Sequence, residues 1–171
     1  MTALKTLGVF SMALFLVAIG VADANAQMFI PVGAPTLTAL PGVELIVDPV
    51  PSDLERHGVT SEAVRADVER RLRGAGIAIY PSQAANPSPA KAYLSVALDA
   101  LALPGDSGYA LSVHVQLRQT LRSPVTNSNI VNAMTWGLHN ILAVPDSELP
   151  AIRAEIVAFV DQFAEDWASV H

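Results

Sequence analysis

The sequence contains no cysteine, fewer basic than acidic residues, and few charged residues overall. Without cysteine, the chain cannot form disulfides, Cys-ligated zinc sites or iron–sulfur clusters, and it offers neither a thiol nucleophile nor a cysteine for lipid attachment. Its 171 residues include 10 Lys and Arg against 16 Asp and Glu, and the net charge of −6 disfavours nucleic-acid binding, which needs a basic surface. A hydrophobic fraction of 51% excludes a disordered chain.

The first 26 residues have the layout of a secretory signal peptide. Lys5 precedes an apolar stretch over residues 7–21, and the small residues Ala24 and Ala26 follow it. The stretch is shorter than the roughly 20 residues that a membrane-spanning helix needs. We therefore predict cleavage after Ala26, a periplasmic or secreted location, and no transmembrane segment in the exported chain. Export of a chain without disulfides is more typical of a bacterial periplasm than of small disulfide-linked secreted domains.

The rest of the chain divides into an arm and one domain. Residues 27–42 are rich in proline and are predicted to form an extended arm. Residues 43–171 are predicted to form a single α+β domain, because helical and strand periodicities both recur along them.

Two amphipathic helices are expected in this domain. In the first, Thr60 is the predicted N-cap, and Val64, Val68 and Leu72 form one apolar stripe at a spacing of four residues. Asp67 is expected to pair with Arg71 on the solvated side, as Glu69 is with Arg73. The second helix is predicted to begin after Asp146 or Ser147, with Pro150 in its first turn. Its apolar stripe consists of Leu149, Ile152, Ile156, Phe159, Phe163 and Trp167.

Strands are predicted at residues 43–50, 77–80, 92–103, 109–122 and 130–139. The strand over 109–122 alternates most clearly between apolar and polar residues, which predicts one covered and one solvated face. Met134, Trp136 and Leu138 are expected to share a face of the last strand. The predicted order is β-α-β-β-β-β-α. The predicted fold is a two-layer sandwich, with a mostly antiparallel sheet of four or five strands and two long helices on one face.

One sequence motif invites a catalytic interpretation. Gly105-Asp106-Ser107-Gly108 resembles the nucleophile sequence of trypsin-like serine proteases. Those enzymes need two barrels, with a histidine and an aspartate upstream of the serine, whereas this motif lies between two alternating strands. Because its residues favour turns, we predict a hairpin turn.

A polar strip along the fourth strand is the predicted binding surface. It consists of Ser112, His114, Gln116, Arg118 and Thr120, to which Trp136 and His139 are added from the next strand. The histidines lack metal-ligand spacing, so neither a metal site nor a cofactor is predicted. Asp99 is expected on the open face of the sheet or near the end of its strand. Glu165 and Asp166 diverge by about 100° on their helix, which predicts a solvated position rather than acid–base catalysis.

Two stretches carry a resemblance to bacterial envelope proteins. Residues 67–77 resemble the helix-to-strand passage of small envelope proteins, and Val160-Asp161-Gln162-Phe163 with Trp167 is similar to the closing helix of a family of uncharacterised secreted or periplasmic α+β proteins. The element order is similar to that of the lipopolysaccharide-assembly lipoprotein and of the N-terminal domain of the Tol translocation protein. The chain differs from the lipoprotein in having no N-terminal cysteine.

Three functions remain open from the sequence. The first is an exported, non-enzymatic binding or envelope-assembly module, whose exposed sheet face and edge bind a peptide strand or another envelope protein by strand addition, with the polar strip as the binding surface. The alternative is a small periplasmic hydrolase with a site assembled from His139, Asp99 and Ser112. The third is a structural envelope protein that only associates with itself.

Overall fold

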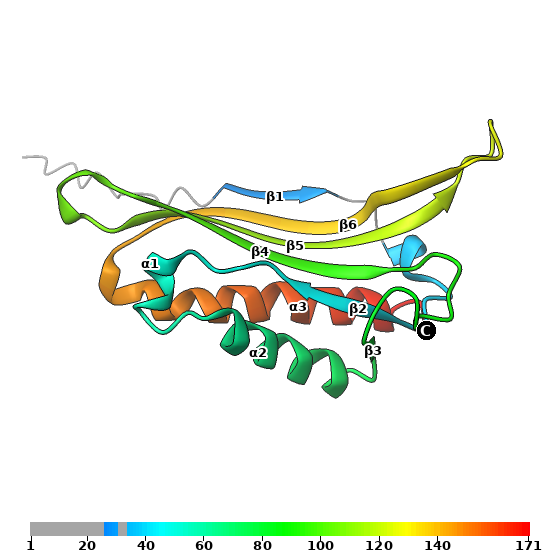
Figure 1. Ribbon diagram of the computed structural model, residues 1–171, viewed down its shortest axis with the longest axis horizontal. Helices are drawn as coiled ribbons and strands as arrows, with labels where there is room; N and C mark the ends of the chain where they lie inside the picture. The colour runs from blue at the N-terminus through cyan, green and yellow to red at the C-terminus, as the bar shows by residue number, and fades with distance from the viewer. Residues whose placement is uncertain (1–25, 31–33) are drawn as a thin grey trace, which may run out of the picture.

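The computed structural model describes residues 26–30 and 34–171 (Figure 1). The predicted signal peptide lies outside these residues, apart from Ala26. The strands are β1 (Ala26–Ile30), β2 (Gly42–Val47), β3 (Ala78–Tyr80), β4 (Tyr93–Ala102), β5 (Tyr109–Arg122) and β6 (Asn129–Val144). The α-helices are α1 (Ser52–Glu55), α2 (Ser61–Gly74) and α3 (Ile152–Ala168), and the 3-10 helices are η1 (Ala34–Leu37), η2 (Pro104–Asp106) and η3 (Asp146–Ala151).

The predicted α+β class is confirmed, but the sheet is mixed rather than mostly antiparallel. Its strand order is β1-β6-β5-β4-β2-β3. The pairs β4–β5, β5–β6 and β6–β1 are antiparallel, whereas β2 runs parallel to both β4 and β3. The parallel β2–β3 pair arises because the chain leaves β2 through α1 and α2 and returns beside it in the same direction, as crossover connections do. Strand β4 then pairs with the other side of β2.

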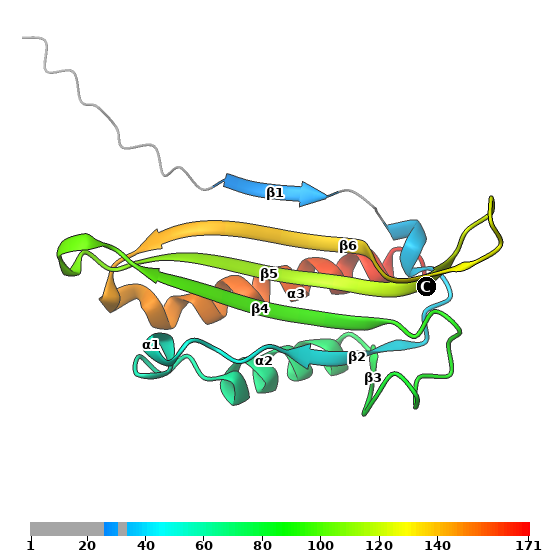
Figure 2. The same cartoon turned by 45° about the horizontal axis from the view of Figure 1, so that its top comes forward.

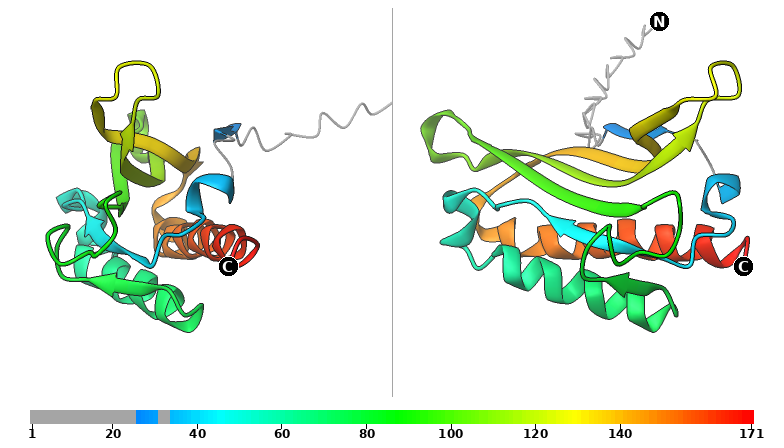
Figure 3. Two further views of the ribbon diagram at one scale, coloured as in Figure 1. Left: turned by 90° about the vertical axis from the view of Figure 1, so that its right-hand side faces the viewer. Right: turned by 45° about the vertical axis from the view of Figure 1, so that its right-hand side comes forward.

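Helices α2 and α3 contact each other and cover the same face of the sheet (Figure 3). The N-cap prediction for α2 is correct, since Thr60 Oγ1 accepts a hydrogen bond from Ala63 N at 3.1 Å. The last helix begins later than predicted. Residues 146–151 form η3, and the α-helix starts only at Ile152. Pro150 explains this difference, because it has no N–H to donate within a helix.

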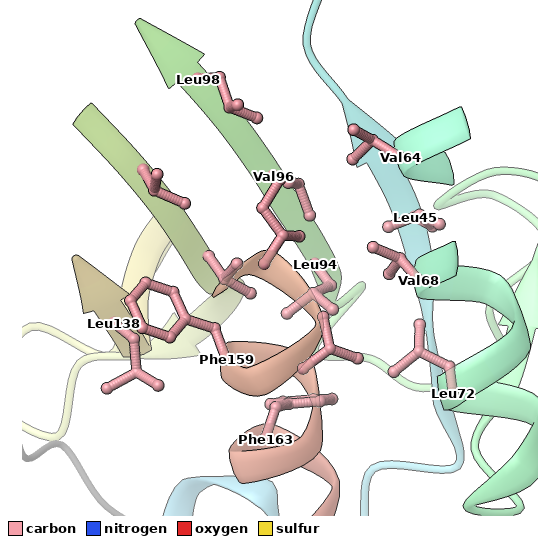
Figure 4. Close-up of a cluster of buried hydrophobic side chains, with 14 of the residues drawn as sticks. Leu45, Val64, Val68, Leu72, Leu94, Val96, Leu98, Leu138, Phe159 and Phe163 are labelled. Atoms are coloured by element: carbon pink, nitrogen blue, oxygen red, sulfur yellow. The ribbon is translucent and has the colours of Figure 1, made fainter. Parts of the chain in front are cut away.

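The core lies between the helices and the inner face of the sheet (Figure 4). Helix α2 contributes the predicted stripe, and α3 contributes Phe159 and Phe163. Alternate residues of each strand face these helices because side chains alternate along a strand. The sheet residues drawn in the close-up include Leu45, Leu94, Val96, Leu98 and Leu138.

The segment predicted as an extended arm is built into this core. Strand β1 pairs with residues 137–141 of β6. The short helix η1 places Leu37 in the core, and the loop after it buries Leu40. Apolar side chains in the proline-rich segment explain this packing, since their burial is favourable whatever the backbone conformation.

A β-bulge changes which side chains of β6 share a face. Leu117 pairs with Trp136, but the next residue of β5, Arg118, pairs with Met134, so Thr135 is the extra residue. Trp136 therefore faces the core, while Met134 is on the opposite face with Arg118. The expectation that Met134, Trp136 and Leu138 lie in phase is wrong at Met134 for this reason.

Asp67 has different partners from the predicted one. Its carboxylate accepts hydrogen bonds from Arg70 at 2.6 Å and from Arg153 of α3 at 2.8 and 2.5 Å. Arg71 instead lies 3.5 Å from Asp161 of α3. The prediction considered one isolated helix, whereas α3 packs beside α2 and brings its own charged groups within reach. The predicted pair of Glu69 with Arg73 is present at 2.9 Å.

Candidate functional site

The outer face of the sheet is the face of β4, β5 and β6 opposite α2 and α3, and in the described chain no helix lies over it (Figure 2). Strand pairing arranges its residues in rows across the three strands. One row contains Asp99, Ser112 and Ile141, and the next contains Ala97, His114 and His139. Further rows contain Ser95, Gln116 and Gly137, and then Tyr93, Arg118 and Met134. The polar strip therefore runs along the middle strand of this face.

Ser112, His114 and His139 form a hydrogen-bonded cluster. Ser112 and His114 are two residues apart on β5 and so point to the same side, while His139 is the direct cross-strand partner of His114. The Ser112 hydroxyl lies 2.7 Å from His114 Nε2 and 3.1 Å from His139 Nε2. A hydroxyl has one proton, so it donates to one ring and accepts from the other when one Nε2 is protonated and the other is not.

The protonation of His114 is linked to its neighbours. Burial lowers its pKa below the ordinary value, because a charged imidazole is poorly solvated there. The nearby His139 lowers the pKa of His114 further, and the carboxylate of Asp99 opposes both effects by raising it. The net result favours a neutral His114 at neutral pH, and a neutral ring can accept the Ser112 proton.

A shallow hollow of about 200 Å³ adjoins this cluster. Asp99, Leu101, Ser112 and Ile141 are among its lining residues, and they come from all three strands of the outer face. The prediction that Asp99 lies on the open face is confirmed, because its side chain is exposed there. Leu101 and Ile141 were not predicted as site residues. Only the pairing of β4 and β6 with β5 brings them beside Ser112.

The remaining strip residues extend the polar surface along β5. Arg118 donates a hydrogen bond from its guanidinium to Gln116 Oε1 at 3.0 Å. Thr120 is partly exposed beyond them, and its backbone N–H donates to Ala90 O at 2.7 Å. The five strip residues are all partly exposed, so their side chains are accessible without the large desolvation that a buried polar site would require.

Trp136 does not belong to this surface. It is buried on the inner face, where its ring packs edge-on against Phe163 with ring centroids 5.0 Å apart. Its indole N–H donates to Asp166 Oδ2 at 2.7 Å. The prediction of a merely solvated Asp166 is therefore incomplete, because the Asp166 carboxylate accepts a hydrogen bond from the core side chain of Trp136. The Trp136 side chain of β6 reaches the turn of α3 that carries Asp166, which no pattern within α3 could indicate.

A second hollow lies on the other side of the molecule, between α2 and α3. It has a volume of about 500 Å³. Arg70, Arg71 and Arg153 line it together with Asp67 and Asp161. Arg71 pairs with Asp161 and Arg153 with Asp67 across the two helices, while Arg70 pairs with Asp67 within α2. These ion pairs join the two helices, and their charged groups are already engaged with one another. The outer face of the sheet is therefore the better candidate for recognition of a partner.

Within the described ranges, no three His, Asp or Glu residues are grouped in a way that could hold a metal ion. No helix there is long and apolar enough to cross a membrane. Searches with known protein families, curated proteins and solved structures found no match to the chain. The resemblance to envelope proteins therefore stays a prediction from the sequence pattern.

Proposed function

We propose that this protein is an exported, non-enzymatic binding module of the bacterial envelope, and that the outer face of β4, β5 and β6 captures its partner. The observation that carries the proposal is the uncovered polar strip on a sheet whose other face packs against α2 and α3 in the core. The covered face provides a rigid support, and the strip presents hydrogen-bonding groups with little rearrangement. Preorganised groups of this kind lose less entropy when a partner binds.

The preferred partner is an extended segment of another envelope protein. A rigid strip of alternating side chains on one strand matches the repeat of an extended peptide, whose side chains also alternate. The sheet edge formed by β2 and β3 is poorly suited to adding a strand from a partner, because its backbone groups are already engaged. There, Arg65 donates a hydrogen bond to the Leu45 carbonyl at 3.2 Å, and β3 pairs with Gly42, Val43 and Glu44 of β2.

Photo-crosslinking in living cells tests this proposal. A photoreactive amino acid replaces Gln116 in a chain with a C-terminal tag, since the predicted export removes the N-terminus. A matched chain carries the same amino acid in place of Arg56, an exposed residue just after α1 and away from the strip. We expect a defined protein adduct from position 116 only. Equal adducts from both positions, or none from position 116, would contradict a binding role for the strip.

Variants of the strip give a second readout. Replacing Gln116 and Arg118 together with alanine removes two polar contacts, and most contact residues each cost less than about 1 kcal/mol of binding when truncated to alanine. We expect the adduct, trapped in this background from a photoreactive residue at Ser95 in the same row, to fall about tenfold. Arg56→Ala is the control. Circular dichroism establishes that both variants stay folded.

A hydrolase is the second candidate, favoured by the short distance between Ser112 and the neutral His114. Ser112 would be the nucleophile, His114 the general base, and the hollow beside Asp99 the acyl site. The position of Ser112 disfavours it, because its strand pairs on both sides and its backbone N–H groups are not directed toward a developing oxyanion. Labelling with a fluorophosphonate probe decides between the two functions. Ser112-dependent labelling would establish the hydrolase.

A further inference from the structure

The end of the β5–β6 hairpin, residues 121–131, extends beyond the body of the protein (Figure 1). We call these residues the hairpin tip. The last paired residue of β5 with β4 is Arg118, so the tip continues past the end of the neighbouring strand. The turn is held by its own contacts: Ser123 N donates to Ser128 O at 2.8 Å, and Arg122 Nε donates to Asn127 Oδ1 at 2.6 Å.

The hairpin tip exposes aliphatic side chains at a high density. Val125 is 90% exposed and Val131 is 67% exposed. Ile130 and Leu121 are 49% and 38% exposed. In soluble proteins a local concentration of exposed apolar side chains marks a surface that contacts a partner or a lipid. Here the side chains are at the far end of a projection, so they can enter a lipid layer or a partner surface while the rest of the domain stays in water.

The charge of the same region has the opposite sign to the whole chain. Between residues 107 and 145 there is neither Asp nor Glu, and the formal charges are Arg118 and Arg122, although the net charge of the protein is −6. Each of these guanidinium groups donates one hydrogen bond within the protein. Arginine has five N–H donors, so further donors of both side chains are suited to phosphate oxygens.

We propose that the hairpin tip inserts shallowly into an anionic lipid surface, with Val125, Ile130 and Val131 among the acyl chains and Arg122 against the lipid phosphates. Apolar side chains combined with cations are the pattern that binds anionic bilayers at their interface. A lipid surface fits better than a protein partner, because a stable protein interface buries about 800 Å² on each side. One hairpin end is narrow for that area. This docking is independent of the polar strip and leaves the outer face accessible.

Sedimentation with vesicles tests the proposal on the protein without its predicted signal peptide. Vesicles of phosphatidylglycerol and phosphatidylethanolamine are compared with vesicles of phosphatidylcholine alone. We expect the protein to sediment with the anionic vesicles and to be released as the salt concentration rises, because salt screens the arginine contacts. Absence of sedimentation with anionic vesicles, or equal sedimentation with both kinds, would overturn the proposal.

Two aspartate substitutions locate the contact. V125D with V131D places charges in the tip and should lower vesicle binding at least tenfold. L101D is the matched control, because Leu101 is 70% exposed but belongs to β4 near the opposite end of the sheet. Equal loss of binding in both variants would exclude a specific role for the tip. Circular dichroism of each variant establishes that the fold is retained.

A fluorescent residue reports insertion directly. V125W places an indole at the tip, and its emission should shift to shorter wavelength when anionic vesicles are added. The unchanged chain is the control for the response of Trp136 and Trp167. If the protein binds native envelope membranes but not protein-free vesicles made from their lipids, the tip recognises a membrane protein and the lipid proposal is wrong.

Discussion

The imidazole rings of His114 and His139 stack on neighbouring strands, with ring centroids 4.0 Å apart and planes 7° from parallel. Both rings also approach the hydroxyl of Ser112 through Nε2. Two protonated rings at this separation would repel each other, so the stacked pair favours at most one charge. This relationship gives the outer face a group of side chains whose hydrogen bonding depends on pH.

Stability should therefore fall when the solution is acidified through the range in which His114 titrates. The folded protein holds the pKa of His114 below its ordinary value of 6.5. Between the folded and the unfolded pKa, the unfolded chain therefore binds more protons than the folded protein. The contribution is fully present above about pH 6.5 and is lost as the pH falls through the folded pKa. H139Q removes a neighbour that lowers this pKa and should reduce the pH dependence. Urea unfolding at several pH values measures it.

The control for this experiment is H57Q, which changes a histidine that packs against Tyr109 rather than against the cluster. We expect this variant to keep the slope of the unchanged protein between neutral pH and about pH 5. If H139Q and H57Q change the slope equally, the stacked pair is not its cause.

The hydrogen bond from Trp136 to Asp166 should contribute measurably to stability. D166A leaves the indole N–H in the core without its acceptor, which costs about 1–3 kcal/mol in the free energy of unfolding. E165A changes the adjacent, exposed carboxylate and should cost less than about 0.5 kcal/mol. Denaturant unfolding followed by tryptophan fluorescence measures both. Similar losses in the two variants would mean that the hydrogen bond is unimportant.

Asp67 should join α2 to α3 more strongly than the other interhelical acid does. Burial raises its pKa, but hydrogen bonds from Arg153 and Arg70 outweigh that effect and hold the pKa below 3.8. Its contribution is therefore present above about pH 3.8 and is lost as the pH falls through the folded pKa. D67N should cost about 1–3 kcal/mol at neutral pH, whereas D161N, at a more exposed pair, should cost under about 1 kcal/mol. Equal costs at neutral pH would contradict this assignment.

Gly108 should not tolerate a side chain. Its φ is +113°, and an added Cβ would lie 2.1 Å from the Val144 carbonyl oxygen, which belongs to the backbone of β6. G108A should therefore cost more than about 2 kcal/mol. Gly105, in the same turn, has a φ of +73° with open space around it, so G105A should cost only about 1 kcal/mol. Both variants introduce backbone strain, but only G108A introduces a clash. The difference between their thermal unfolding temperatures therefore measures the effect of the clash.

Local patterns predict most of the elements but not their neighbours. The stripe of Val64, Val68 and Leu72 is confirmed as buried, and the turn at residues 105–108 does connect two antiparallel strands. Alternation alone predicts the wrong face for Met134, because a bulge at Thr135 interrupts an otherwise regular strand. A bulge depends on the register with the partner strand, so periodicity within one strand does not indicate it.

The candidate site shows the same division. The alternation of apolar and polar residues along β5 is sufficient to predict that Ser112, His114, Gln116, Arg118 and Thr120 share one face. Their grouping with His139, Asp99, Leu101 and Ile141 depends on pairing with β4 and β6. Trp136 is predicted near the strip, but it is in phase with Leu138 and pairs with buried Leu117, so it points into the core toward α3.

The amino-acid sequence by itself determined the α+β class, the amphipathic faces of α2 and β5, and the absence of cysteine chemistry. These properties follow from composition and from the local geometry of a helix or strand. The tertiary structure alone decided that β2 runs parallel to its neighbours, that Asp67 pairs with Arg153, and that two histidines share one hydroxyl. Each of these joins residues distant in the chain, and such contacts depend on how the packed elements bring them together.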